Sequence, residues 1–157
     1  FVENYRRLTR IPTPIRTQIS VAELFTDLKK LFPEEEFQFE APSPELKLNA
    51  DRTQIEQVLI NLLKNAREAC NRKLDKNIQV KVKKLSTGNT ALTISDNGEG
   101  ILPDVLDKIF VPFFTTKTSG SGIGLSLCKQ IMTLHDGSIN VKSEIGKGSC
   151  FILTFPK

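Results

Sequence analysis

The sequence predicts an α/β sandwich in which one sheet is covered by helices. Segments with the apolar patterns of strands and of helices are mixed along the chain. Two pairs of strand-like segments, 77–85 with 90–96 and 138–143 with 149–155, are joined by short turns, which is typical of antiparallel hairpins. The chain has 157 residues, 39% of them hydrophobic and 25% charged, and such a chain can bury one core. Since few βαβ units are expected, one sheet packed against helices is favoured.

Each element follows from a local signal. Pro12 and Pro14 stop the helical pattern of residues 1–10, because proline lacks the backbone donor that a helix needs. Ser20 and Glu23 have the spacing of a capping box and open the next helix. In the first third of the chain we expect a strand over 16–19, a helix from 20 to about 32 that Pro33 ends, and strands over 37–41 and 45–50 on either side of a Pro-Ser-Pro turn. A helix over 51–73 and the first hairpin follow. The irregular stretch 97–124 is expected to contain a short helix near 103–109, and a helix over 125–134 then precedes the second hairpin.

The predicted helix over 51–73 is the longest element. Asp51 can cap its first turn, with Gln54 three residues further on. Apolar residues recur at helical spacing and are expected to face the core. These residues are Ile55, Leu59, Leu62, Leu63 and Ala66.

The chain is predicted to contain one domain. Residues 1–14 read as the end of an upstream helix and a linker, and residues 15–157 as the domain; the chain starts with Phe1, so we expect a piece of a longer protein. No apolar run approaches the roughly 20 residues that span a bilayer, and we expect no signal peptide. Three scattered cysteines indicate reduced thiols in a core. We expect a cytoplasmic domain. This expectation is compatible with an inner-membrane anchor upstream in the whole protein.

The net charge of +4 suits an anionic small ligand or an acidic protein partner. Lysines and arginines are spread along the chain, without the dense cluster of a nucleic-acid-binding surface. We therefore expect no nucleic acid partner.

Two asparagines on the long helix are candidate metal ligands. Asn61 and Asn65 are four residues apart, so they share one helix face at the border between the core stripe and solvent. Amide oxygens are hard ligands that suit a Mg²⁺ ion sharing its shell with water and substrate phosphates. The alternative is that both are ordinary polar surface residues.

A carboxylate follows the strand over 90–96. Asp96 ends this strand, and Gly98 and Gly100 let the backbone turn sharply or approach a ligand closely. A buried carboxylate there can accept a hydrogen bond from an exocyclic amine such as that of adenine. The alternative is an ordinary Asp-Asn-Gly turn.

A glycine-rich string opens the third helix. Gly120, Gly122 and Gly124 alternate there, and backbone N–H groups at a helix N-terminus suit phosphate. The spacing is not that of a P-loop, and no strand precedes it closely, so neither a P-loop nor a Rossmann fold is supported. Three phenylalanines upstream, among them Phe113, indicate a mobile lid with an aromatic anchor. Lys117 is placed to reach phosphates, or is a solvated loop lysine.

The order and spacing of these segments resemble a known family. NLLKNA (61–66), DNGEGI (96–101), FVPFF (110–114) and GSGIGL (120–125) resemble the N, G1, F and G2 boxes of the ATP-binding catalytic domain of bacterial sensor histidine kinases, in the GHKL ATPase superfamily. Residues 135–156 resemble its terminal hairpin, so the resemblance covers about 16–157. The short lid and the NLLKNAREA string look most like the nitrogen-regulation branch.

The resemblance implies a Bergerat-type fold: a mixed, mostly antiparallel sheet with three helices on one face. It implies ATP and Mg²⁺ as cofactors, with Asn65 coordinating Mg²⁺, Asn61 supporting the metal and phosphates, and Asp96 binding the adenine amino group. The other implied nucleotide-binding residues are Gly98, Gly100, Ile101 and Ser149 around adenine, and Phe113, Lys117, Gly120, Gly122, Gly124 and Leu125 at the lid and phosphate end.

The sequence departs from the family pattern at two places. Glu68 and Ala69 stand where many members have a basic and an aromatic residue, which puts a phosphate contact and an adenine stack from this helix in doubt. Arg67 and Lys117 are candidates for the missing charge. The single histidine, His135, lies in the turn after the third helix, so we expect it to be structural and the phosphoacceptor histidine to be elsewhere.

By this resemblance, the chain transfers the γ-phosphate of Mg-ATP to a histidine on a separate dimerisation domain, for relay to an aspartate of a response-regulator receiver domain. We expect a monomer for this chain and a homodimer for the whole protein. ATP hydrolysis of the gyrase type is an alternative, but it uses a helix Glu where this chain has Asn61, which cannot act as a base. A non-catalytic interaction module is another alternative.

Overall fold

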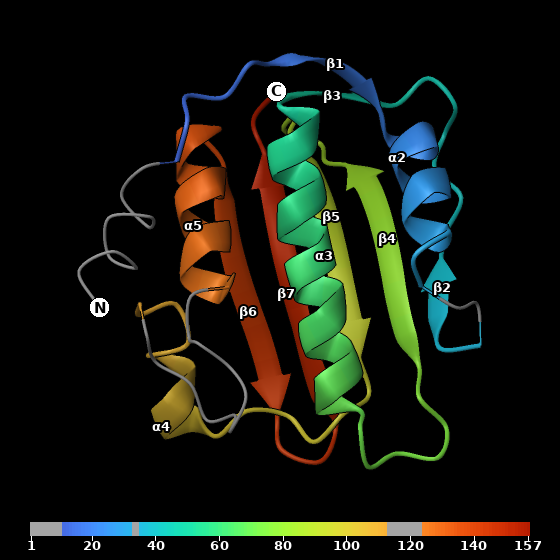
Figure 1. The fold of residues 1–157 in the computed structure, drawn as a ribbon, viewed down its shortest axis with the longest axis vertical. Helices are drawn as coiled ribbons and strands as arrows, with labels where there is room; N and C mark the ends of the chain where they lie inside the picture. The colour runs from blue at the N-terminus through green and yellow to red at the C-terminus, as the bar shows by residue number, and fades with distance from the viewer. Residues whose placement is uncertain (1–10, 33–34, 113–123) are drawn as a thin grey trace.

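A computed structural model describes residues 11–32, 35–112 and 124–157 of the chain. Three helices cover one face of a five-stranded sheet, and a two-stranded sheet lies across one end (Figure 1). The elements are β1 (Thr17–Ser20), α2 (Val21–Lys29), β2 (Phe37–Phe39), β3 (Lys47–Ala50), α3 (Arg52–Ala69), β4 (Ile78–Lys84), β5 (Thr90–Asp96), α4 (Pro103–Leu106), α5 (Gly124–Leu134), β6 (Ser138–Glu144) and β7 (Gly148–Phe155). The predicted α/β sandwich is confirmed.

The main sheet has the strand order β2-β4-β5-β7-β6. Both predicted hairpins form, since β4 pairs antiparallel with β5 and β6 pairs antiparallel with β7. Strand β5 also pairs antiparallel with β7, whereas β2 runs parallel to β4. The sheet is therefore mixed and mostly antiparallel, with β5 at its centre.

The prediction of one sheet is wrong for the two strands β1 and β3. They pair with each other, with Ile19 opposite Leu48, and not with the main sheet. The reason is burial, since Ile19, Leu48 and Ala50 are all buried in the core. This small sheet connects the entry of α2 to the entry of α3.

The predicted N-caps of two helices form. The Ser20 hydroxyl accepts a hydrogen bond from the N–H of Glu23 at 3.2 Å, and the Asp51 carboxylate accepts one from the N–H of Gln54 at 3.2 Å. These bonds satisfy donors that the first turn of a helix leaves open. The predicted stripe of α3 is buried, from Ile55 to Ala66.

The long helix is shorter than predicted. It ends at Ala69, because the backbone leaves helical geometry at Cys70, whose N–H still reaches the carbonyls of Ala66 and Arg67. Asn97 then holds the following loop: its Oδ1 accepts from the N–H of Asn77 and its Nδ2 donates to the carbonyl of Asp75, both at 2.9 Å. Tertiary contacts therefore end the helical pattern early.

Two further findings concern the described part of the chain. No described helix is both long and apolar enough to cross a bilayer. Cys70, Cys128 and Cys150 are all free thiols, and the first two are buried, as the sequence predicts.

Candidate functional site

Several element ends meet at one end of the sandwich (Figure 1). Strand β5 and helix α3 end there, and the turn between β6 and β7 closes the same end, while α5 begins beside Asn61 at the middle of α3. A hollow at this end is lined by residues of β5, β6 and β7 and of the turn between β6 and β7, among them Asp96, Ser143, Lys147 and Ser149. The fold therefore brings the segments 61–66, 96–101 and 124–125 towards one place.

Asp96 is a buried carboxylate at the end of β5. Its Oδ1 accepts hydrogen bonds from the N–H of Gly98 at 2.9 Å and from the N–H of Ser149 at 3.3 Å. Burial raises its pKa above the usual value, although both N–H groups act in the opposite direction. Both of these N–H groups, which belong to the described residues, donate to Oδ1. The other carboxylate oxygen, Oδ2, can therefore accept a hydrogen bond from a ligand.

The loop after Asp96 packs tightly on two neighbours. A Cβ added to Gly98 would lie 2.4 Å from the backbone oxygen of Ala69, and one added to Gly100 would lie 2.3 Å from that of Glu144. Gly100 also has a φ of +81°, which disfavours residues with a side chain. Glycine is therefore required here for close backbone approach, which fits the predicted pocket-shaping role.

The two helix amides lie where the sequence predicts. Asn61 and Asn65 are both half-buried at the edge of the α3 core face. The Asn61 amide nitrogen lies 3.9 Å from Cys128 Sγ, and a Cβ on Gly124 would be 3.9 Å from the same amide. Asn61 is therefore adjacent to the start of α5, and its amide oxygen is the atom left for a cation.

The amide oxygens of Asn61 and Asn65 suit a magnesium ion that is coordinated by protein at only some of its positions. No group of three or more His, Cys, Asp and Glu side chains among the described residues could hold a metal. Burial raises the pKa of Cys128 to about 12, so this thiol stays neutral and is no ligand. Amide oxygens together with water and phosphate oxygens form the kind of shell that Mg²⁺ accepts.

Arg67 does not point to the nucleotide side of α3. Its guanidinium lies 5.3 Å from the ring centre of Phe32 and 5.2 Å from that of Phe37, and its Nε lies 3.5 Å from a carboxylate oxygen of Glu36. As a candidate for the missing phosphate charge, Arg67 is therefore wrong. The physical reason is that this aromatic and acidic pocket, formed with β2, already binds the cation.

Sequence reasoning missed Ser143. The Ser143 hydroxyl accepts from the N–H of Ile101 at 2.8 Å and lies 2.8 Å from the hydroxyl of Ser149. No local signal in the sequence marks Ser143, because its position depends on the register between β6 and β7. It joins the loop after β5 to the strand that carries Ser149.

The remaining predicted residues divide into two groups. Ile101 and Leu125 are half-buried and pack against the core. Phe113, Lys117, Gly120 and Gly122 lie outside the described residues, so their predicted roles stay predictions.

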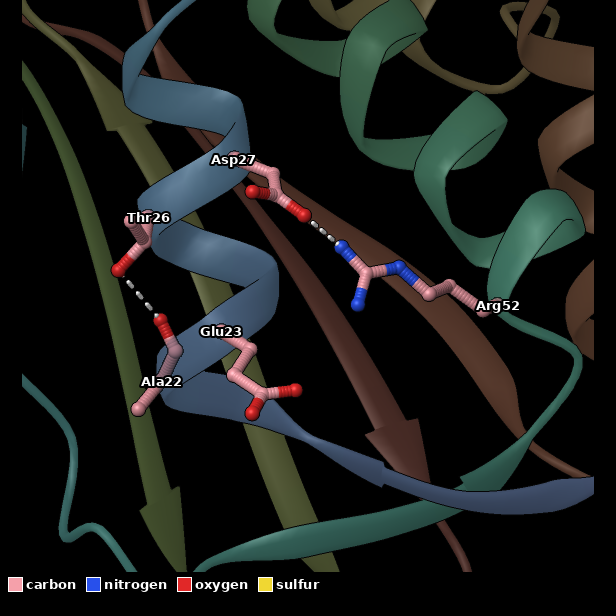
Figure 2. A pocket seen from close by; sticks show the side chains of 5 residues that line it. All are labelled: Ala22, Glu23, Thr26, Asp27 and Arg52. Carbon is pink, nitrogen blue, oxygen red and sulfur yellow. Dashed lines mark hydrogen bonds and ion pairs between the residues drawn. The ribbon is translucent and has the colours of Figure 1, made fainter.

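A second hollow lies at the other end of the helical layer (Figure 2). Arg52, at the start of α3, reaches across it to Asp27 of α2 in an ion pair, and Thr26 bonds back to the carbonyl of Ala22. The 18 residues of α3 separate this hollow from Asp96 by about 27 Å of helix. It brings together none of the predicted site residues.

The fold and these residues match a known family. The model of the histidine kinase-, DNA gyrase B- and HSP90-like ATPases matches residues 50–157. The chain belongs to this ATPase family. The catalytic domain of histidine kinase ThkA has a TM-score of 0.79 at 36% identity, over 90% of this chain and 95% of that one. The predicted histidine kinase catalytic domain, and with it ATP binding, is thereby confirmed.

Curated relatives of this ATPase domain are sensor kinases. Sensor histidine kinase ZraS of Salmonella typhimurium is 42% identical over 110 residues, which are 70% of this chain and 23% of ZraS. The histidine kinase AtoS of Escherichia coli is 43% identical over 109 residues, which are 69% of this chain and 18% of AtoS. The chain thus spans less than a quarter of these relatives. The nitrogen-regulation branch stays a prediction.

Proposed function

We propose that this histidine kinase domain binds Mg-ATP at the end of the sheet around Asp96 and transfers the γ-phosphate to a histidine on a separate dimerisation domain. In that step the acceptor nitrogen forms a bond to phosphorus, the bond to the β-phosphate oxygen breaks, and ADP leaves. The phosphoryl group then passes to an aspartate of a response-regulator receiver domain. The domain boundary at residue 15, the monomeric state of this chain and the homodimeric state of the whole protein belong to the same proposal.

The observation that carries the proposal is the environment of Asp96. Two backbone N–H groups hold Oδ1, which turns a buried carboxylate into a fixed acceptor at the open end of the sheet. An adenine amino group donates to such an acceptor, whereas the O6 of guanine would repel it. A hydrogen bond to a charged group contributes about 1.5–3 kcal/mol, which corresponds to roughly a 10- to 150-fold preference.

The phosphate end is proposed to lie between α3 and the start of α5. Asn61 and Asn65 would hold the magnesium ion through their amide oxygens, and the N-terminus of α5 at Gly124 would face the phosphates. When bound, Mg²⁺ would neutralise the phosphate charge. We keep Lys117 and the residues of the glycine-rich string as proposed phosphate contacts, and Phe113 as the proposed lid anchor.

The phosphoacceptor is proposed to be a histidine outside this chain. His135 is 2% exposed. Its Nε2 lies 3.0 Å from the N–H of Asp51, and its Nδ1 lies 2.8 Å from the carbonyl of Ile131. Both ring nitrogens are therefore occupied in structure-forming bonds, which supports a separate acceptor. ThkA, a similar protein, was solved in complex with the response regulator TrrA, and we propose a partner of that kind here.

Calorimetric titration with ADP, with and without Mg²⁺, tests the proposal. We expect binding that requires Mg²⁺, because the proposed metal ligands act together with the phosphates. Asn65→Ala should remove this Mg²⁺ dependence and leave the thermal unfolding transition in place. The control is Lys81→Ala, an exposed substitution on the open face of β4. It should change neither the Mg²⁺ dependence of binding nor the thermal unfolding transition. Binding by the wild-type chain that ignores Mg²⁺ would contradict the metal assignment, and no binding at all would contradict the nucleotide site.

A further inference from the structure

Three polar side chains form one row across three neighbouring strands. Asp96 on β5 pairs with Ser149 on β7, and Ser149 pairs with Ser143 on β6. Directly opposite residues in a sheet point to the same face. The adjacent row on that face is apolar: Ile94, Phe151 and Val141. The three residues Asp96, Ser149 and Ser143, which we call the polar row, therefore lie where the core ends and the proposed nucleotide site begins.

Ser143 is the member of the polar row with the most partners. Its Oγ accepts from the N–H of Ile101 at 2.8 Å, lies 2.8 Å from the Oγ of Ser149, and lies 3.1 Å from the carbonyl oxygen of Gly148. It thus contacts the loop after β5, the first residue of β7, and Ser149, which is paired with Asp96. The side chain is half-buried, so these bonds are only partly in competition with water.

The hydrogen bond that Ser143 donates determines where the proton of the Ser149 hydroxyl can point. A hydroxyl has one proton to donate, and the proton of Ser143 has two possible acceptors, Ser149 and Gly148. If it goes to Ser149, the proton of Ser149 is free to point into the pocket. If it goes to Gly148, the Ser149 proton is held by Ser143, and the Ser149 oxygen presents only lone pairs to the pocket.

The first arrangement complements adenine. The pairing edge of adenine carries an amino donor next to the ring acceptor N1. Asp96 offers an acceptor, and beside it Ser149 offers a donor when Ser143 donates to it, either directly to N1 or through one water. In hypoxanthine and guanine this order is reversed, because O6 is an acceptor and N1–H is a donor.

We propose that Ser143 is a positioning residue of the nucleobase pocket, whose hydroxyl directs the Ser149 proton towards N1 of adenine. This inference rests on the proposed nucleotide site around Asp96. Ser143 itself touches no ligand atom, and its effect on nucleotide binding is transmitted through Ser149. It would make the domain selective for a base with an acceptor at N1 next to an amino donor.

The test compares ADP with 1-deaza-ADP, in which C–H replaces N1. For Ser143→Ala we expect a Kd for ADP about three- to tenfold higher than wild type, because the Ser149 hydroxyl keeps its proton but is no longer held in the orientation that donates to N1. The Kd for 1-deaza-ADP should change by less than about twofold, because the acceptor that Ser149 serves is missing. Ser143→Thr keeps the hydroxyl and should restore ADP binding.

Two further variants separate positioning from a general structural effect. Ser149→Ala should show a selective loss at least as large, and the Ser143→Ala/Ser149→Ala pair should bind ADP no more weakly than Ser149→Ala alone, because both changes act on the one hydrogen bond to N1. Ser138→Ala changes an exposed serine of the same strand β6 and should leave both Kd values unchanged. Thermal unfolding of each variant establishes that it is folded.

The outcomes distinguish this inference from the proposed function. Equal weakening of ADP and 1-deaza-ADP by Ser143→Ala would make Ser143 merely structural and overturn the inference, while the nucleotide site would stand. An unchanged Kd for ADP in Ser143→Ala would overturn it as well. A wild-type chain that binds neither nucleotide would overturn the proposed function first, and the inference with it.

Discussion

At the scale of single residues, the carboxyl group of Asp96 experiences two opposing influences. Burial raises its pKa, and the N–H groups of Gly98 and Ser149 partly offset this. Because the raised pKa means that the native state holds the proton more tightly than the unfolded chain, the free energy of unfolding falls as pH rises through the window between the ordinary and the raised value. Ionised Asp96 therefore lowers stability at neutral pH, at the place where the proposed function requires its charge.

Asp96→Asn should separate these two effects. The amide oxygen of Asn can still accept from both N–H groups, so we expect an unfolding free energy at neutral pH equal to or above wild type, and a flatter pH dependence. Its NH₂ group would face the amino group of adenine, so the Kd for ADP should rise at least about tenfold. Denaturant unfolding and calorimetry between about pH 4 and pH 8 measure both.

For the wild-type domain, ADP affinity should fall as pH drops through the raised pKa of Asp96, since a protonated carboxyl loses the charge that accepts the amino group. Asp104→Asn on α4 is an exposed control and should keep the wild-type profile. A wild-type affinity that is independent of pH over this range would contradict an adenine contact to ionised Asp96.

Gly98 and Gly124 should respond differently to the same substitution. In Gly98→Ala the new Cβ would meet the backbone oxygen of Ala69 at 2.4 Å, so the loop or the end of α3 must shift. We expect a loss of about 1–3 kcal/mol of stability. In Gly124→Ala the nearest atoms lie at 3.9 Å, which is ordinary contact, so thermal unfolding should shift little or upward. An equal loss in both variants would contradict the close packing at Gly98.

At the scale of elements, α3 contacts different partners on its different faces. One edge carries Asn61 and Asn65, and another carries Arg67 against Phe32 and Phe37. Arg67→Ala should therefore lower stability by about 0.5–1.5 kcal/mol, from a cation–π contact and an exposed ion pair. The Kd for ADP should stay unchanged, with Lys64→Ala, an exposed change one turn earlier, as the control. A tenfold loss of ADP affinity in Arg67→Ala alone would return Arg67 to the phosphate site.

The start of α3 and the end of α5 are joined through His135. Its two ring bonds connect Asp51 with Ile131, and Arg16 adds a bond to the carbonyl of Leu134 at 2.6 Å. Residues before β1 also contact α3, since Gln54 donates to the carbonyl of Pro12 at 2.8 Å. The described part of the predicted linker, residues 11–14, therefore lies against the domain at the end remote from Asp96.

His135→Ala should leave the part-buried N–H of Asp51 without its partner and create a small cavity, while the carbonyl of Ile131 keeps its bond to the backbone N–H of residue 135. We expect a loss of about 2–4 kcal/mol in the free energy of unfolding. The Kd for ADP should stay within about twofold of wild type wherever the variant is folded, because α3 separates the two places by about 27 Å. If nucleotide affinity falls together with stability in folded protein, the two ends are coupled.

At the scale of the whole molecule, the domain has a nucleotide site and, by our proposal, no acceptor. The single histidine is buried and bonded at both nitrogens. Incubated with ATP and Mg²⁺, this chain alone should form no acid-labile phosphohistidine. When it is mixed with a dimerisation domain that carries the acceptor histidine, phosphorylation of that domain should appear. Phosphohistidine detected on His135 by mass spectrometry would contradict this division.

The sequence predicted most of the fold because its signals are local. The caps at Ser20 and Asp51, the stripe on α3 and the two hairpin turns each depend on residues a few positions apart. Pairings between distant segments were not predictable in this way. Strand β3 pairs with β1, and α3 ends at Ala69 because tertiary contacts outweigh local pattern there.

For the candidate site, too, some features follow from local sequence and others depend on the tertiary structure. By itself, the sequence proposed Asn61, Asn65 and Asp96 as ligands of a metal and an amine donor, and these roles stay predictions; it also indicated the ATPase family that the comparisons confirm. Only the tertiary structure decided that Arg67 binds Phe32 and Phe37 and that the polar row brings Ser143 beside Ser149. The physical reason is that side-chain direction and strand register are set by packing between distant segments, and local sequence carries little information about either.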